Sequence, residues 1–105
     1  MTKRFLGAFL FLGLVAASAK TYDLKLLQTS IVAGTELKPG EYRVDLNNDK
    51  VVISNGQQSA ESAVKVEQSE AKFATTTVRY AVNDGKYRIQ EIRLRGTKLK
   101  LVFND

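Results

Sequence analysis

The amino-acid sequence predicts a small all-β domain. Apolar and polar residues alternate over several short runs after residue 20, which is typical of strands that bury one face. Turn-forming residues separate these runs, and no helical repeat of apolar residues is present in that part of the chain. We therefore expect seven or eight short, mostly antiparallel strands, arranged as a β-sandwich or a partly open barrel.

Residues 1–19 have the pattern of a secretory signal peptide, which we expect to form a helix. Lys3 and Arg4 give a positive start, and an apolar stretch follows over residues 5–15. The segment Ala17-Ser18-Ala19 fits the small-residue rule for cleavage. The apolar stretch is shorter than the roughly 20 residues that span a bilayer, so no stable transmembrane anchor is predicted. No Cys follows it, which excludes a lipoprotein anchor.

Cleavage between Ala19 and Lys20 leaves residues 20–105 as a single β-domain that is secreted or periplasmic. Removing the two charges of the leader from the 16 Lys and Arg leaves 14, against 11 Asp and Glu, a net charge of +3. This mild charge does not call for a nucleic-acid partner. A domain of this size without Cys depends on packing and strand pairing, or gains stability by self-association.

The absence of His and Cys limits the chemistry of the chain. Neither a nucleophile with an imidazole base nor a thiolate or imidazole metal site can be built. Covalent haem attachment, which needs Cys, is also excluded. We therefore expect a protein that is not an enzyme, with no catalytic residues, no metal site and no cofactor.

The first predicted strands flank a proline-glycine turn. The run Lys20–Gln28 alternates, and Ser30–Ala33 is a short apolar piece. Pro39 and Gly40 suit the two central positions of a type II turn, where Gly40 supplies the positive φ. The run Glu41–Leu46 then alternates cleanly and predicts a strand.

The middle of the chain predicts two more strands. Lys50–Ser54 is the first, and Asn55-Gly56 is a common hairpin dipeptide. The polar stretch Gln57–Glu61 predicts a loop or a weak edge. Ser62–Gln68 alternates again and predicts the second strand.

The last part of the chain predicts a three-stranded ribbon. Lys72–Val82 and Lys86–Leu94 are expected to form a hairpin through Asn83-Asp84-Gly85, and Thr97–Phe103 follows as the third strand. The alternation in the second strand changes phase between Ile89 and Ile92. One extra residue restores a common inner face, so we predict a β-bulge at Gln90-Glu91.

Basic residues gather on the last two predicted strands, against a single acid, and form a possible anion-binding face. These are Lys86, Arg88, Arg93, Arg95, Lys98 and Lys100. Candidate partners are an anionic polysaccharide, a lipid or an acidic protein. The alternative is a solvated sheet face whose charges discourage edge-to-edge aggregation. Aromatic residues do not interleave on this face, so nucleic-acid binding is not expected.

Four tyrosines fall on predicted inner faces: Tyr22, Tyr42, Tyr80 and Tyr87. They either pack in the core with their hydroxyls at the rim or line a cavity for a ligand. The first interpretation goes with an exported, non-catalytic binding or structural module. The second goes with a carrier that holds a small apolar ligand inside the β-domain.

The segment Leu37-Lys38-Pro39-Gly40-Glu41-Tyr42-Arg43-Val44 resembles the L-x-P-G-x-Y-x-V strand entry of carboxypeptidase-regulatory-like and other transthyretin-like β-sandwich domains. This resemblance implies a non-catalytic extracellular module with an accessory or carbohydrate-associated role. The overall order, a leader and then a β-domain without Cys, is similar to small uncharacterised exported proteins of environmental Gram-negative bacteria. That similarity implies no activity and no site residues.

Overall fold

The computed structural model describes residues 20–103, which form nine strands and no helix, so the all-β prediction is confirmed. The strands are β1 (Lys20–Leu26), β2 (Ser30–Val32), β3 (Thr35–Leu37), β4 (Gly40–Asn47), β5 (Lys50–Ser54), β6 (Ser59–Gln68), β7 (Thr77–Asn83), β8 (Lys86–Arg93) and β9 (Leu99–Phe103). That part of the chain contains no helix long and apolar enough to cross a membrane. The expected signal-peptide helix at residues 1–19 lies outside the described residues.

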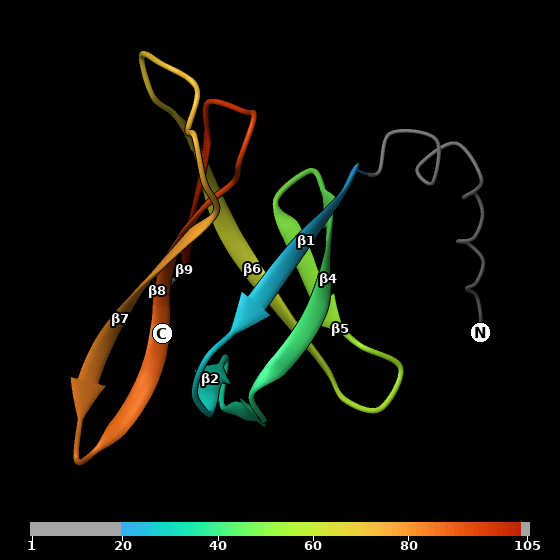
Figure 1. Ribbon diagram of the computed structural model, residues 1–105, viewed down its shortest axis with the longest axis vertical. Helices are drawn as coiled ribbons and strands as arrows, with labels where there is room; N and C mark the ends of the chain where they lie inside the picture. Colours follow the sequence, from blue (N-terminus) through green and yellow to red (C-terminus); the bar gives the residue numbers. More distant parts are fainter. Residues whose placement is uncertain (1–19, 104–105) are drawn as a thin grey trace, which may run out of the picture.

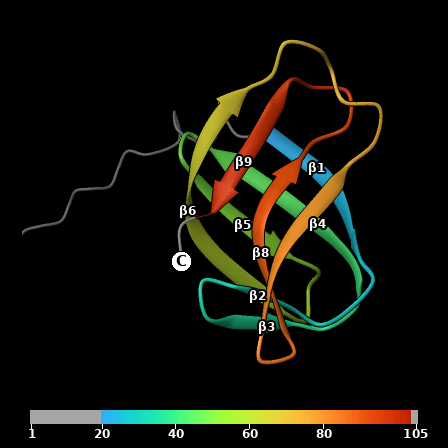
Figure 2. The same cartoon turned by 90° about the vertical axis from the view of Figure 1, so that its left-hand side faces the viewer.

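The nine strands belong to one sheet that folds over itself (Figure 1). Its order is β1-β4-β5-β6-β9-β8-β2-β3, and β7 pairs with the remaining edge of β8. The sheet folds over along the long strand β6, because Ser59–Ala63 pairs with β5 while Val64–Gln68 pairs with β9. Two layers result, and Figure 2 shows their strands crossing one behind the other. The sheet does not close, because no pairing joins β1 to β7 within residues 20–103.

The apolar core lies between the two layers. Alternation in β4 and β5 turns Val44 and Ile53 inward, and the facing layer contributes Ile92 and Leu101. Eight apolar side chains are completely buried: Val32, Leu37, Val44, Val51, Ile53, Ile92, Leu94 and Leu101. Full burial of one such side chain contributes roughly 1.5–3 kcal/mol to stability. Packing of this kind replaces the disulfides that a chain without Cys cannot form.

Strand β8 contains the predicted bulge. Arg79 of β7 stands opposite Glu91, and the next residue of β7 stands opposite Ile89, so Gln90 is the extra residue. The bulge lets Ile89 and Ile92 share the inner face, where both are almost completely buried. The prediction made from the change of phase is therefore confirmed.

The hairpin between β7 and β8 has the predicted position and a two-residue loop. Asp84 and Gly85 have φ values of 55° and 75°. Two consecutive positive φ values match the twist of antiparallel strands, which explains the Asp-Gly sequence.

Two predicted strands of the ribbon begin later than expected. The strand predicted at Lys72–Val82 starts only at Thr77, because Phe73 bonds to the turn after β8 instead of continuing a strand. Its N–H donates to the carbonyl of Thr97, and its carbonyl accepts from the N–H of Gly96, both at 2.8 Å. The strand predicted at Thr97–Phe103 starts at Leu99, because the Thr97 hydroxyl closes a turn by accepting from the N–H of Leu99 at 2.9 Å.

Three details of the first half of the chain are also corrected. Ser59–Glu61 is part of β6 and not a loop, because the small side chain of Ala60 fits the inner face opposite Ile53. Thr35–Leu37 forms an additional short strand, β3, paired with β2. Gly40 has a φ of 153°, far from the roughly +80° of a type II turn, and it already begins β4.

Candidate functional site

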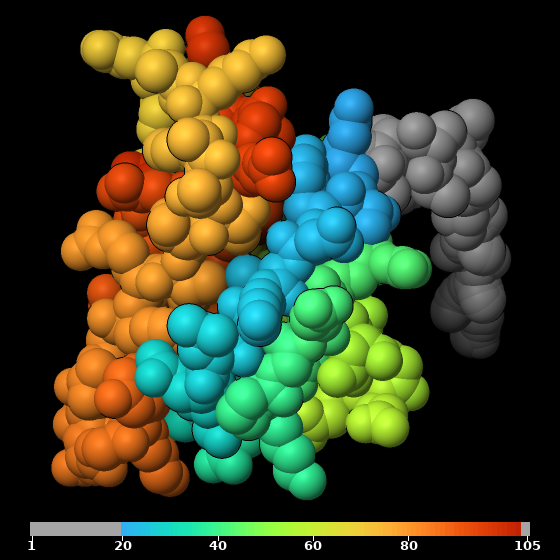
Figure 3. Space-filling model, viewed as in Figure 1, coloured from blue at the N-terminus to red at the C-terminus, as the bar shows by residue number. Residues whose placement is uncertain are grey.

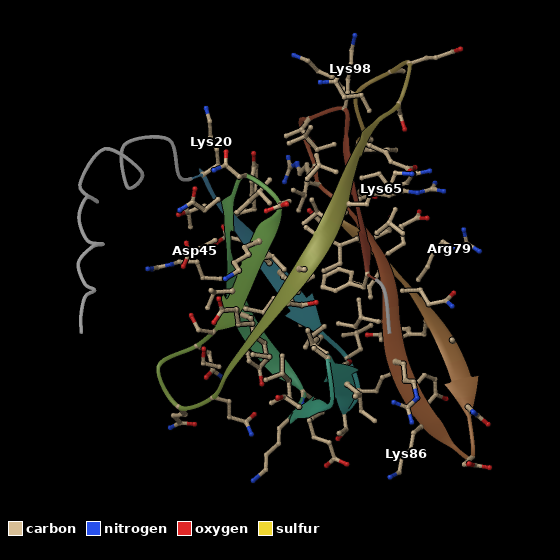
Figure 4. All side chains as sticks on the ribbon, turned by 180° about the vertical axis from the view of Figure 1, so that it is seen from behind. Lys20, Asp45, Lys65, Arg79, Lys86 and Lys98 are labelled. Atoms are coloured by element: carbon tan, nitrogen blue, oxygen red, sulfur yellow. The ribbon has the colours of Figure 1, made fainter. Side chains whose placement is uncertain are left out.

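The predicted anion-binding residues are spread along β8, β9 and the turn between them. Lys86 and Arg88 lie at the start of β8, whereas Arg93 and Lys100 stand opposite each other on β8 and β9. Figure 4 shows Lys86 and Lys98 at opposite ends of the molecule. The six residues therefore divide into separate groups along the sheet.

The middle group is paired with acidic side chains. Arg93 Nε donates to Glu91 Oε2 at 2.7 Å, and Arg79 Nη1 lies 3.6 Å from Glu91 Oε1. On the neighbouring strands, Lys100 Nζ lies 3.4 Å from Glu67 Oε1. On β7, β8, β9 and β6, basic side chains thus lie beside acidic ones. Glu67 and Arg79 were absent from the sequence-based site, because only the strand pairing brings them beside β8 and β9.

The Glu91 carboxylate is the most buried charge of this arrangement. Glu91 is 8% exposed, because the two arginines and the neighbouring strands cover it. The Arg93 guanidinium also lies over the ring of Phe73, with Cζ 5.6 Å from the ring centre. A carboxylate this far from water depends on its hydrogen-bonded cation, so Arg93 has a structural role.

The other basic residues of the set have no ion-pair partner within residues 20–103: Lys86, Arg88, Arg95 and Lys98. Arg95 borders a groove beside β1, and Lys86 lines a smaller pocket near the turn between β7 and β8. Anion binding by the set as a whole stays a prediction.

The groove runs beside the free edge of β1. It has a volume of about 730 Å³, and Thr21–Lys25 of β1 form one wall. Thr75, Thr76 and Arg95 form the opposite wall, just before β7 and just after β8. Figure 3 shows β1 and the segment that leads into β7 facing each other across a seam on the surface. Glu41 and Tyr42 of β4 complete the lining.

The charged side chains of β1 that line the groove have neighbours of opposite sign on β4. Asp23 stands opposite Arg43, and Lys25 stands opposite Glu41. None of these four side chains, nor Arg95, has a salt bridge within 4.0 Å among residues 20–103. These side chains, and the unpaired backbone edge of β1, can therefore accept polar partners.

Tyr42 anchors the wall of the groove and stabilises the turn before β4. Its hydroxyl donates to the carbonyl of Lys38 at 2.6 Å and also lies 2.9 Å from Gln58 Oε1, which in turn accepts from the N–H of Lys38. Burial raises the pKa of the Tyr42 phenol above its ordinary value. The hydroxyl thus stabilises the turn before β4 and remains protonated at neutral pH.

The tyrosines follow the core-packing interpretation in part. Tyr42 is buried, Tyr22 and Tyr80 pack against the core, and the rings of Tyr80 and Tyr87 meet edge to face at 5.5 Å. The Tyr80 hydroxyl lies 3.0 Å from Ser30 Oγ. Tyr22, Tyr42 and Tyr80 thus pack in or against the core, and the hydroxyls of Tyr42 and Tyr80 are hydrogen-bonded.

The groove could not be predicted from the sequence, since a free edge depends on strand order. Arg95 of the basic set is one of its lining residues, and the run Thr75-Thr76-Thr77, which fits a strand equally well, contributes two more. Within the described part of the chain, no group of three or more Asp and Glu is placed to hold a metal ion.

The chain matches no family model, no curated protein and no solved structure. The resemblance of Leu37–Val44 to transthyretin-like domains therefore stays a prediction.

Proposed function

We propose that residues 20–105 form an exported, non-catalytic binding module of the periplasm or cell exterior, and that it binds through the groove beside β1. The leader pattern of residues 1–19 supports the location. The absence of His and Cys supports a role without catalysis.

The groove itself carries the proposal. It combines an unpaired strand edge with charged side chains that have no salt bridge among residues 20–103. Concave sites that bind ligands combine a shaped hollow with a few polar groups in this way. The alternative of an apolar-ligand carrier has less support, because the groove is open and eight core side chains are completely buried.

The carboxylates in the groove fit binding better than acid–base chemistry. Asp23 stands opposite Arg43 and Glu41 stands opposite Lys25, so each carboxylate has a cation as its cross-strand neighbour. Two carboxylates that divide the roles of acid and base have contrasting surroundings that separate their pKa values. Asp23 and Glu41 have similar surroundings on the same two strands.

A thermal-shift screen of residues 20–105 against acidic polysaccharides, lipids, small apolar ligands and peptides tests this proposal. A compound that binds the native state raises the melting temperature by mass action. We expect Arg95→Ser, which changes the groove, to remove the shift. Lys98→Ser is the matched control, because Lys98 is exposed and lies outside the groove lining. Equal shifts in both variants, or no shift with any compound, would contradict the proposal.

A further inference from the structure

The free edges of β1 and β7 run in the same direction. Six successive pairings connect β1 to β7 through β4, β5, β6, β9 and β8, and all are antiparallel. An even number of reversals leaves β1 and β7 with the same direction, and both arrows point towards the lower end in Figure 1. A single additional strand can therefore be antiparallel to both edges at once.

Tyr22 of β1 and Val78 of β7, on the two edge strands, are less buried than their cross-strand neighbours within the layers. Tyr22 of β1 stands opposite Val44, and Val78 of β7 stands opposite Ile92. Val44 and Ile92 are completely buried, whereas Tyr22 and Val78 are only partly covered. All four belong to the inner face or pack against the core, so the core extends to the edge strands and is less covered at Tyr22 and Val78.

The groove has the length of a short strand. It begins at Thr21 and ends near Lys25, because the chain after β1 turns towards β7 and brings Ser30 Oγ to 3.0 Å from Tyr80 Oη. Five extended residues span about 17 Å. An occupant of five to seven residues matches this opening, on the order of a usual strand length.

We propose that the groove binds an extended peptide segment of a partner protein, which inserts antiparallel to both β1 and β7 and closes the sheet. This inference rests on the proposed function and names its partner class. A segment without other strand neighbours can bond on both sides, as in recognition by strand addition. A folded second copy cannot, because its own edge strand is already paired on one side.

The charges of β1 define the chemistry of the segment. On the outer face it needs a basic residue beside Asp23 and an acidic residue beside Lys25. On the inner face it needs apolar residues beside Tyr22 and Leu24, with an acidic group in reach of Arg95. Strand β4 already meets the requirements of β1 on its other edge, with Glu41, Tyr42, Arg43 and Val44 in sequence.

A synthetic peptide with the β4 sequence, GEYRVDLN, is therefore the probe for the free edge. Its binding to isotope-labelled residues 20–105 is followed by NMR. We expect shifts at the amides of Thr21–Lys25 and in β7 near Val78. The matched control peptide, GRYEVDLN, exchanges the two charges and should bind less tightly, because it places like charges beside Asp23 and Lys25.

Methylation of single peptide amides distinguishes the modes of binding. A strand held on both sides donates alternate N–H groups to the two edges. Each methylation along the bound segment should therefore lower the affinity, by about tenfold where one hydrogen bond is lost. Sensitivity at alternate amides only, with shifts confined to β1, would overturn closure of the sheet.

The remaining outcomes separate this inference from the proposed function. If methylation has no effect, or the peptide does not bind while another compound gives a shift that depends on Arg95, strand insertion is wrong and groove binding stands. If no compound and no peptide binds, both are wrong. Dimerisation of the domain through β1 at NMR concentrations would overturn the insertion of a segment in favour of a second copy.

Discussion

At the scale of single residues, the basic side chains of β8 and its following turn have unequal roles. Arg93 bonds to the buried carboxylate of Glu91 at 2.7 Å, whereas Arg95 has no salt bridge within residues 20–103. Loss of a partner leaves a buried charge uncompensated, which costs much more than loss of a solvated side chain.

We therefore expect Arg93→Ser to lower the free energy of unfolding by roughly 1–2 kcal/mol. Arg95→Ser should change it by less than about 0.5 kcal/mol. Urea denaturation of the two variants and the unchanged domain measures the difference. Equal losses in the two variants would show that the Arg93–Glu91 bond does not contribute to stability.

Tyr42 gives a prediction that depends on pH. Its hydroxyl bonds to the turn at Lys38, so Tyr42→Phe should lower the free energy of unfolding by about 1 kcal/mol near neutral pH. The phenol ionises near pH 10 in the unfolded chain. Because burial raises its pKa in the folded domain, its contribution is complete below about pH 10 and is lost as pH rises through the folded pKa.

The stability difference between the unchanged domain and Tyr42→Phe should therefore shrink above pH 10. Chemical denaturation at a series of alkaline pH values measures this difference, and groups that titrate in both proteins cancel. A difference that stays constant into strongly alkaline solution would contradict the raised pKa.

At the scale of elements, the bulge in β8 is the most specific feature that sequence reasoning predicted. The change of phase between Ile89 and Ile92 is a local signal, since both residues must face the same core. The predicted start of β7 was wrong because Phe73 bonds to the turn after β8, which no local pattern reveals. The three-residue strand β3 is too short to show alternation.

Deletion of Gln90 should leave the domain folded. Without Gln90, Ile89, Glu91 and Ile92 still alternate, so every inward side chain keeps its face and only the local twist is lost. Deletion of Arg88 is the matched control, because it turns Tyr87 outward and Lys86 inward. We expect the control to lose more than about 3 kcal/mol of stability and the Gln90 deletion to lose less. The spread of NMR chemical shifts shows whether each deletion variant is folded, and urea denaturation measures its stability. Equal losses of stability in the two variants would contradict the role of the bulge.

At the scale of the whole molecule, the free edges of β1 and β7 are the features that the sequence could not reveal. Alternation shows which side chains of a strand face inward, but strand order depends on contacts between distant residues. The partners of Arg93 and the groove wall around Arg95 were therefore missed. A site formed by an unpaired edge is visible only once the order is known.

Hydrogen exchange tests this open edge directly. In β1, amides that point to β4 should exchange slowly, and the intervening amides, which point into the groove, should exchange fast. In β5, which has a neighbour on each side, all amides should be slow. NMR-detected exchange of residues 20–105 measures both strands in one experiment. Slow exchange along the whole of β1 in dilute solution would mean that its outer edge is already paired, and strand insertion would then have no place in the molecule. If that protection appears only at high concentration, the pairing is between copies of the domain. The edge of β1 is then open in the isolated domain and available to any suitable strand.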